Sequence, residues 1–117
     1  MHERSLVQAL LRQVESIRQD HAAQRVLTVR VSVGEFSGVE PELLQFAFAD
    51  LTSMSVLDGA ELTVDRVPLE CSCRDCGAAT RVEQFRFECA NCQGRNLDIV
   101  RGEELTLESV TLAGEKL

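Results

Sequence analysis

Four cysteines in two C-x-x-C pairs are the residues of this 117-residue chain whose spacing most clearly indicates chemistry. The first pair is Cys73 and Cys76, the second is Cys89 and Cys92, and twelve residues separate the pairs. Two residues between the members of a pair let the chain fold back, so that both sulfurs face one point. Four thiolates gathered in this way match the donors of a closed, tetrahedral Zn²⁺ site. We therefore predict a structural zinc site.

Two other chemistries use similar cysteine patterns. Iron in a rubredoxin-like site has comparable spacing and is the alternative metal. Disulfides belong to oxidising compartments, and nothing else in the sequence points to one. A fifth cysteine, Cys71, forms a Cys-Ser-Cys sequence with Cys73. We interpret Cys71 as a spare thiol, with exchange against Cys73 as the alternative.

A second metal-binding pattern lies at the start of the chain, where His2 follows Met1. The Met1 amine, the backbone nitrogen of residue 2 and the His2 imidazole stand in chelating order, and Glu3 can add its backbone nitrogen or its carboxylate. Such a planar or tetragonal donor set suits Ni²⁺ or Cu²⁺ rather than zinc. A histidine at position 2 is by itself most often a solvated terminal residue, so the pattern alone leaves both interpretations open. The other histidine, His21, falls late in a predicted helix, where it can cap carbonyl groups.

Composition narrows the classes of function. The chain has 19 acidic and 12 basic residues and a formal net charge of −7, which disfavours a broad phosphate-binding surface. It has no apolar run of about 18 residues and no signal-peptide pattern, so we expect a cytoplasmic protein that does not interact with membranes. Four thiolates leave no open position for catalysis on zinc, and the chain lacks phosphate-loop and G-x-S-x-G motifs. We therefore expect no enzymatic activity.

The alternative function is a zinc ribbon that binds nucleic acid or protein. This interpretation accounts for the four cysteines and for nothing else. Nucleic-acid binding needs a basic patch, yet the arginines around the cysteines are interleaved with acidic residues. We therefore expect no nucleic-acid partner.

Hydrophobic spacing predicts the elements that must position these groups. Apolar residues at helical spacing indicate two helices, and strict alternation indicates strands. The predicted helices are 5–24 and 41–54, and the predicted strands are 26–34, 60–65 and 104–112. The alternation slips within the last strand, which predicts a bulge or burial on both faces. A short hairpin is predicted at 81–88, with Phe85 and Phe87 on one face.

This order of elements predicts an α+β fold, in which two helices cover a three-stranded sheet and a zinc-ribbon-like module is inserted before the last strand. We expect the module at 69–100 and the α/β domain at 1–68 plus 101–117. About thirty residues cannot bury enough apolar surface to fold alone, so the metal must supply much of the module's stability.

Three segments of the chain together resemble a known family. They are Met1-His2-Glu3-Arg4-Ser5-Leu6, residues 33–46 with the sequence VGEFSGVEPELLQF, and the two C-x-x-C pairs. In these segments the chain is similar to the HypA/HybF family of hydrogenase maturation proteins, which are nickel metallochaperones. The resemblance extends over essentially the whole chain. Its first two segments are specific, whereas many zinc ribbons share the third.

The resemblance implies how the start of the chain works. His2 would be the principal ligand of a transported Ni²⁺, helped by the Met1 amine and by Glu3. Glu40 stands where some family members have a carboxylate proposed to approach nickel. The family delivers nickel to the large subunit of [NiFe]-hydrogenase together with the HypB GTPase, so these proteins are the expected partners. Both a monomer and a homodimer are compatible with the sequence.

The resemblance also implies a nickel-binding domain at 1–68 plus 101–117 and a separate zinc-binding module at 69–100. The second knuckle departs from the family pattern, because Ala90 stands where many members have proline. This change leaves the turn less rigid and the ligands intact. The implied zinc ligands are Cys73, Cys76, Cys89 and Cys92.

Overall fold

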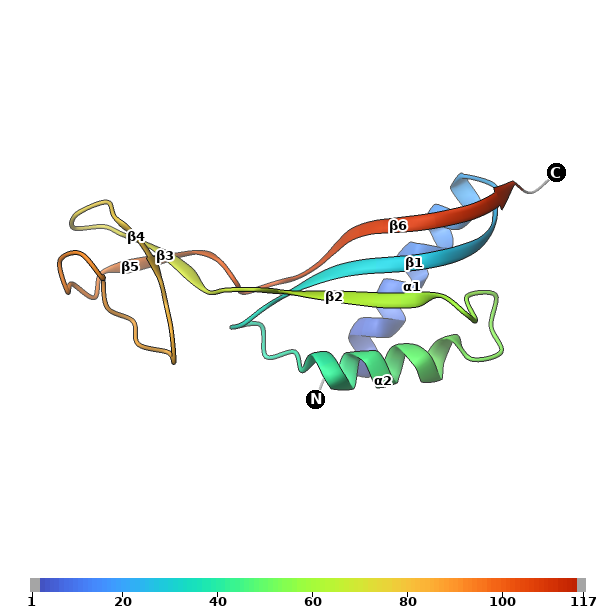
Figure 1. The fold of residues 1–117 in the computed structure, drawn as a ribbon, viewed down its shortest axis with the longest axis horizontal. Coiled ribbons are helices and arrows are strands. Elements are labelled where there is room, and N and C mark those ends of the chain that lie inside the picture. Colours follow the sequence, from blue (N-terminus) through green and yellow to red (C-terminus); the bar gives the residue numbers. More distant parts are fainter. Residues whose placement is uncertain (1–2, 116–117) are drawn as a thin grey trace.

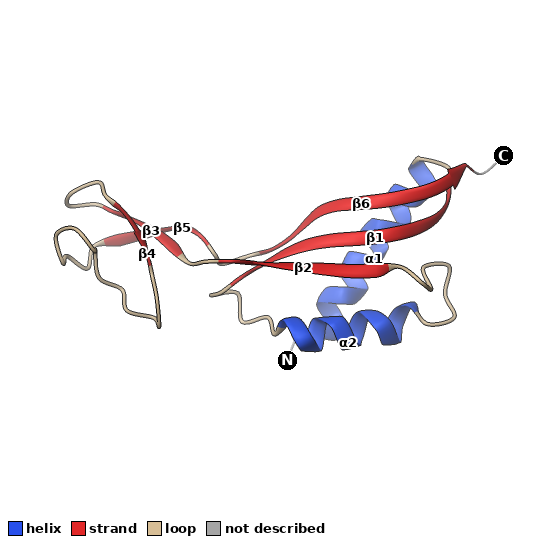
Figure 2. Ribbon diagram, in the orientation of Figure 1, coloured by secondary structure: helices blue, strands red, loops and turns tan. Residues whose placement is uncertain are grey.

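The computed structural model describes residues 3–115, which form two small sheets arranged end to end in an elongated molecule of 59 × 27 × 16 Å (Figure 1). Met1 and His2 lie outside the described residues. The elements, in chain order, are α1 (Glu3–Asp20), β1 (Ala23–Gly34), α2 (Pro41–Thr52), β2 (Glu61–Val67), β3 (Glu70–Cys73), β4 (Ala79–Arg81), β5 (Leu97–Arg101) and β6 (Leu105–Glu115). Figure 2 shows that both helices lie beside the larger sheet, which consists of β1, β2 and β6.

The larger sheet has the strand order β2-β1-β6, with β1 parallel to β2 and antiparallel to β6. Both helices pack on one face of it (Figure 1). The apolar stripe of α1 meets alternate residues of β1 and the buried side of α2, and this contact forms the main core. Its buried members include Val7, Leu10, Val14, Val29, Val31, Leu44 and Phe48. Within residues 3–115, neither helix is long and apolar enough to cross a membrane.

Strand β6 contains the bulge that its sequence pattern predicts. Arg30 of β1 pairs with Ser109, whereas the next residue, Val31, pairs with Leu107. Glu108 is therefore the extra residue on β6, and it reverses the alternation there. For this reason Leu107 and Val110, which differ in parity, both pack against the main core.

The smaller sheet has the order β4-β3-β5, and both outer strands run antiparallel to β3. Its core is small, with Leu69, Cys71 and Val82 buried. The predicted hairpin at 81–88 is wrong. Gln84 and Phe85, with positive φ angles of 53° and 57°, form a turn, but no returning strand follows it, because β4 ends at Arg81 and the next strand, β5, begins at Leu97.

Two glycines lie where the connections between the sheets cross. A Cβ atom at Gly34 would lie 2.2 Å from the carbonyl carbon of Gly102, and one at Gly102 would lie 2.7 Å from the Cα of Leu69. The close approach allows the N–H of Gly34 to donate to the carbonyl of Glu104 (2.9 Å) and that of Phe36 to donate to Gly102 (2.8 Å). Glycine at both positions thus lets the end of β1 and the two connections between the sheets pack closely on one another.

Replacing Gly34 with alanine is expected to lower the free energy of unfolding by about 3 kcal/mol, the upper end of the usual range for overpacking, because the new methyl group overlaps backbone atoms. Denaturant unfolding of the zinc-loaded protein measures the change. Gly38→Ala is the control, since Gly38 has a φ of 77° but no atom within 4 Å of a Cβ. This variant carries only the conformational cost of about 1–2 kcal/mol. A smaller loss for Gly34→Ala than for Gly38→Ala would contradict the steric argument.

Candidate metal centre

The four cysteines of the C-x-x-C pairs come together at the far end of the smaller sheet. All four sulfur atoms lie within 4.8 Å of one another. The Sγ atoms of Cys73 and Cys92 are 3.7 Å apart, and those of Cys76 and Cys89 are 3.5 Å apart. A tetrahedron with metal–sulfur bonds of about 2.3 Å has sulfur–sulfur edges of about 3.8 Å. The cluster therefore has the size of a tetrahedral four-thiolate metal site, which is consistent with zinc.

The two C-x-x-C knuckles, which begin at Cys73 and at Cys89, have the same backbone turn. The N–H of Gly77 donates to the carbonyl of Cys73 (2.8 Å), and the N–H of Gln93 donates to that of Cys89 (2.9 Å). The first turn needs glycine because Gly77 has a φ of 78°. In the second turn the positive φ, 61°, falls on Gln93, the residue before Gly94. Gly94 instead keeps space open, because its Cβ would lie 3.2 Å from the Sγ of Cys92.

Cys89 is buried and is surrounded by hydrogen-bond donors. The backbone N–H groups of Cys92 and Asn91 donate to its Sγ at 3.5 and 3.4 Å. The Cys92 N–H contributes most to lowering the pKa of Cys89 to about 6, while burial of the thiol opposes this shift. Because the thiolate is the form that binds metal, Cys89 is ready to bind at neutral pH.

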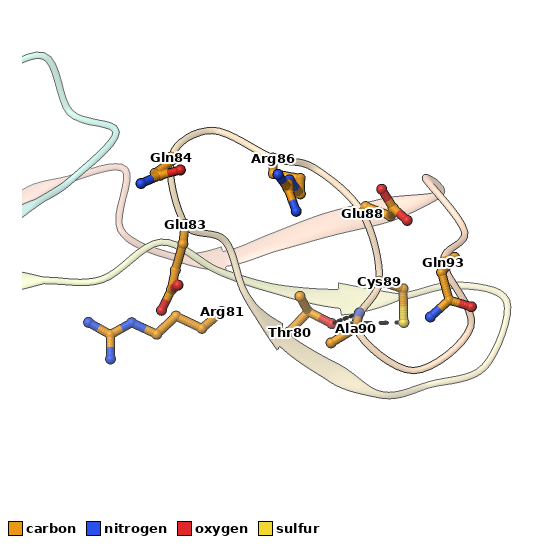
Figure 3. A pocket seen from close by; sticks show the side chains of 9 residues that line it. All are labelled: Thr80, Arg81, Glu83, Gln84, Arg86, Glu88, Cys89, Ala90 and Gln93. Carbon is orange, nitrogen blue, oxygen red and sulfur yellow. Dashed lines mark hydrogen bonds between the residues drawn. The ribbon is translucent and has the colours of Figure 1, made fainter.

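Thr80 supports Cys89 from the neighbouring strand β4, as Figure 3 shows. Its buried hydroxyl donates to the Sγ of Cys89 (3.8 Å) and accepts a hydrogen bond from the N–H of Ala90 (3.2 Å). Sequence reasoning missed this residue, because no motif marks a threonine that lies nine residues before its sulfur partner. Only the pairing of β4 with β3 brings the hydroxyl to the cluster.

Thr80→Val is expected to weaken zinc binding by about 10-fold or more, because groups that orient metal ligands typically contribute 10–100-fold to affinity. Competition with a chelator of known affinity measures the change. Thr63→Val, at an exposed position on β2, is the matched control. Equal zinc affinity in the two variants would show that Thr80 does not support the cluster.

Cys71 lies outside the cluster. It is buried in the small core beside Leu69 and Val82. Burial raises the pKa of its thiol, and the negative charges of Asp98 and Glu103 raise it further. Cys71 is thus packed as a core side chain, and its raised pKa favours the protonated thiol.

The candidate nickel ligands fall at the edge of the described structure. Met1 and His2 lie outside the described residues, but Glu3 is the first residue of α1 and is only 5% exposed. Its carboxylate accepts a hydrogen bond from the backbone N–H of Glu40, the residue before α2 (3.1 Å). The structure therefore brings together two residues that sequence reasoning left unconnected. The other histidine, His21, bonds through Nδ1 to the carbonyl of Ile17 (2.9 Å), as expected at the end of a helix.

Comparison with known proteins gives a consistent result over nearly the whole chain. Residues 1–112 match the family described as "HypA: Hydrogenase/urease nickel incorporation, metallochaperone". A protein named hydrogenase maturation factor HypA from Desulfitobacterium hafniense is 37% identical over 94% of this chain and 96% of its own length. The protein of the same name from Nitrosospira multiformis is 39% identical over 96% of this chain and 97% of its own length.

Solved structures agree. The solution structure of the Ni metallochaperone HypA from Helicobacter pylori has a TM-score of 0.70 and 26% identity, and covers 98% of this chain and 100% of its own. A second solution structure of a HypA protein has a TM-score of 0.75 and 28% identity, with 98% of both chains covered. The chain therefore belongs to the HypA family of nickel metallochaperones for hydrogenase maturation.

Proposed function

We propose that this protein binds Ni²⁺ at its N-terminus and delivers it during [NiFe]-hydrogenase maturation, while the four-cysteine cluster holds a structural Zn²⁺. The proposed nickel ligands are the His2 imidazole, the Met1 amine and the backbone nitrogens of His2 and Glu3. The observation that carries the proposal is the anchored position of Glu3, whose backbone nitrogen is the last of the proposed donors. Membership of the HypA family supports the assignment of nickel as the cargo.

The position of Glu3 suits a nickel ligand on the backbone. The hydrogen-bond ladder of an α-helix does not use the N–H groups of its first turn. The Glu3 nitrogen, at the first position of α1, can therefore bind a metal without disturbing that ladder. Its carboxylate accepts a hydrogen bond from the Glu40 N–H, which anchors the start of α1, and this carboxylate is the alternative donor that Glu3 offers to the metal.

The two donor sets suit different tasks. Four thiolates form a closed site that fits a permanent zinc. Nitrogen donors at the end of a chain favour Ni²⁺ and leave the ion accessible to a receiving protein. We therefore assign zinc to the module at 69–100 and nickel to the domain at 1–68 plus 101–117. The presence of a separate sheet in each part supports this division.

The proposed partners are a HypB-type GTPase and the large subunit of [NiFe]-hydrogenase, in the cytoplasm. We assign no enzymatic activity, since a four-thiolate zinc has no open position for a substrate. Ion pairs in the smaller sheet argue against nucleic acid as a partner. Arg74 pairs with Asp98 (2.6 Å) and Arg101 with Glu70 (3.7 Å), which offsets the positive charge there.

Nickel transfer between purified proteins tests this function. The zinc-loaded protein carrying one nickel is mixed with nickel-free large subunit and HypB-type GTPase, and metal in each separated protein is measured by mass spectrometry. We expect nickel to appear in the large subunit, and His2→Ala protein given the same nickel to deliver no more than buffer does. Equal delivery by the two proteins would reject the N-terminal chelate as the donor.

A further inference from the structure

Three phenylalanines from distant parts of the chain meet between the two sheets. Phe36 lies in the loop between β1 and α2, whereas Phe85 and Phe87 lie in the loop that leads from β4 to the second knuckle. The ring centroid of Phe36 is 5.8 Å from that of Phe85 and 5.8 Å from that of Phe87, at interplanar angles of 53° and 76°. Tilted and edge-on rings at this distance attract each other. Side chains thus join the cysteine module, residues 69–100, to the helix-bearing domain, residues 1–68 plus 101–117.

Each end of this contact is fixed to its own part of the molecule. The N–H of Phe36 donates to the carbonyl of Gly102 (2.8 Å), and the N–H of Glu35 donates to that of Val67 (2.9 Å). On the other side, Phe87 packs on the module's core, next to Leu69 and Val82. The three rings therefore connect the backbone at the junction with the core of the cysteine module.

The loop that carries Phe85 adopts a strained backbone in this arrangement. Gln84 and Phe85 both have φ angles in the left-handed region, which residues with a Cβ rarely adopt. Burial of the ring does not explain the strain, because Phe85 remains 64% exposed. The two ring contacts that this backbone allows oppose its strain. The observed arrangement of the loop therefore depends on these contacts, and their loss leaves the strain unopposed.

We propose that Phe36, Phe85 and Phe87 form a latch that sets the angle between the cysteine module and the helix-bearing domain. When the latch is open, the module turns about its two connections, between β2 and β3 and between β5 and β6. When it is closed, the loop of Phe85 lies on the side of the molecule where α2 begins (Figure 1). This inference does not depend on which metal binds at the start of the chain.

Residual dipolar couplings of backbone amides in the zinc-loaded full-length protein test the latch. We expect one alignment tensor to fit both sheets of the wild type, and Phe85→Ala and Phe36→Ala each to lose that common tensor. Phe85→Tyr keeps an aromatic ring at this position, so we expect this variant to retain the common tensor of the wild type. Phe46→Ala is the matched control, because Phe46 is a 71% exposed ring on α2 outside the cluster.

Two results would overturn the latch. One is a common tensor that persists in both alanine variants, and the other is separate tensors for the two sheets of the wild type. Zinc content and amide shifts within each sheet show whether a variant remains folded. If Phe85→Ala loses zinc, Phe36→Ala decides the matter, because Phe36 lies outside the module.

Discussion

Removing the metal from the four-cysteine cluster is expected to unfold residues 69–100 and to leave the helix-bearing domain folded. Among residues 3–115, the apolar core of the smaller sheet outside the four-cysteine cluster has three buried members, Leu69, Cys71 and Val82. This small core cannot offset the entropy of ordering about thirty residues. Zinc contributes about 10–16 kcal/mol to the folding of zinc-finger peptides. The larger sheet and both helices share a separate core that contains no cysteine. Amide spectra recorded before and after addition of a strong chelator show which residues lose their structure.

Two cysteine variants sharpen this prediction. Cys89→Ser removes one ligand of the cluster and is expected to abolish stoichiometric zinc binding. Cys71→Ala removes a buried cysteine outside the cluster and is expected to keep one zinc. Dispersed amide signals from 69–100 after complete chelation would contradict the dependence of the module on metal.

His2→Ala is expected to abolish stoichiometric nickel binding and to leave one zinc bound. The imidazole is the only side-chain nitrogen in the proposed chelate, and its loss opens the rings that close around the ion. The free amine titrates near pH ~8 and imidazole near ~6.5, so wild-type binding should weaken as the pH falls through this range and protons compete with nickel. Equilibrium dialysis at several pH values, followed by metal analysis, measures both effects.

The chain supplies its own control for this variant. His21 is the other histidine, and its Nδ1 bonds to the carbonyl of Ile17 at the end of α1. His21→Ala is therefore expected to bind nickel like the wild type. Loss of nickel in His21→Ala, or its retention in His2→Ala, would move the site away from the start of the chain.

Local patterns were sufficient to predict most elements of the fold. Helix α2 begins at Pro41, where proline suits the first helical position. The change of parity between Leu107 and Val110 indicated an irregular last strand, which the structure resolves as a bulge at Glu108. The four cysteines were predictable as a cluster because ligand spacing within each knuckle is a local property.

The features that sequence reasoning missed depend on contacts between distant segments. The left-handed backbone of Gln84 and Phe85 could not be predicted from their residue types, because residues other than glycine seldom adopt this conformation. The hydrogen bond from the Glu40 N–H to Glu3 joins residues 37 positions apart. Such contacts appear only after both elements are placed, and sequence periodicity carries no information about them.

The most direct test of the N-terminal nickel site is a titration of zinc-loaded protein that carries one extra residue before Met1. This protein keeps every side chain of the native chain, including His2 and all cysteines, but moves the free amine out of chelating position. We expect the native protein to bind one nickel and the extended protein to lose this binding while its zinc content stays unchanged. Equal nickel affinity and stoichiometry in the two proteins would contradict the N-terminal chelate and require a different nickel site.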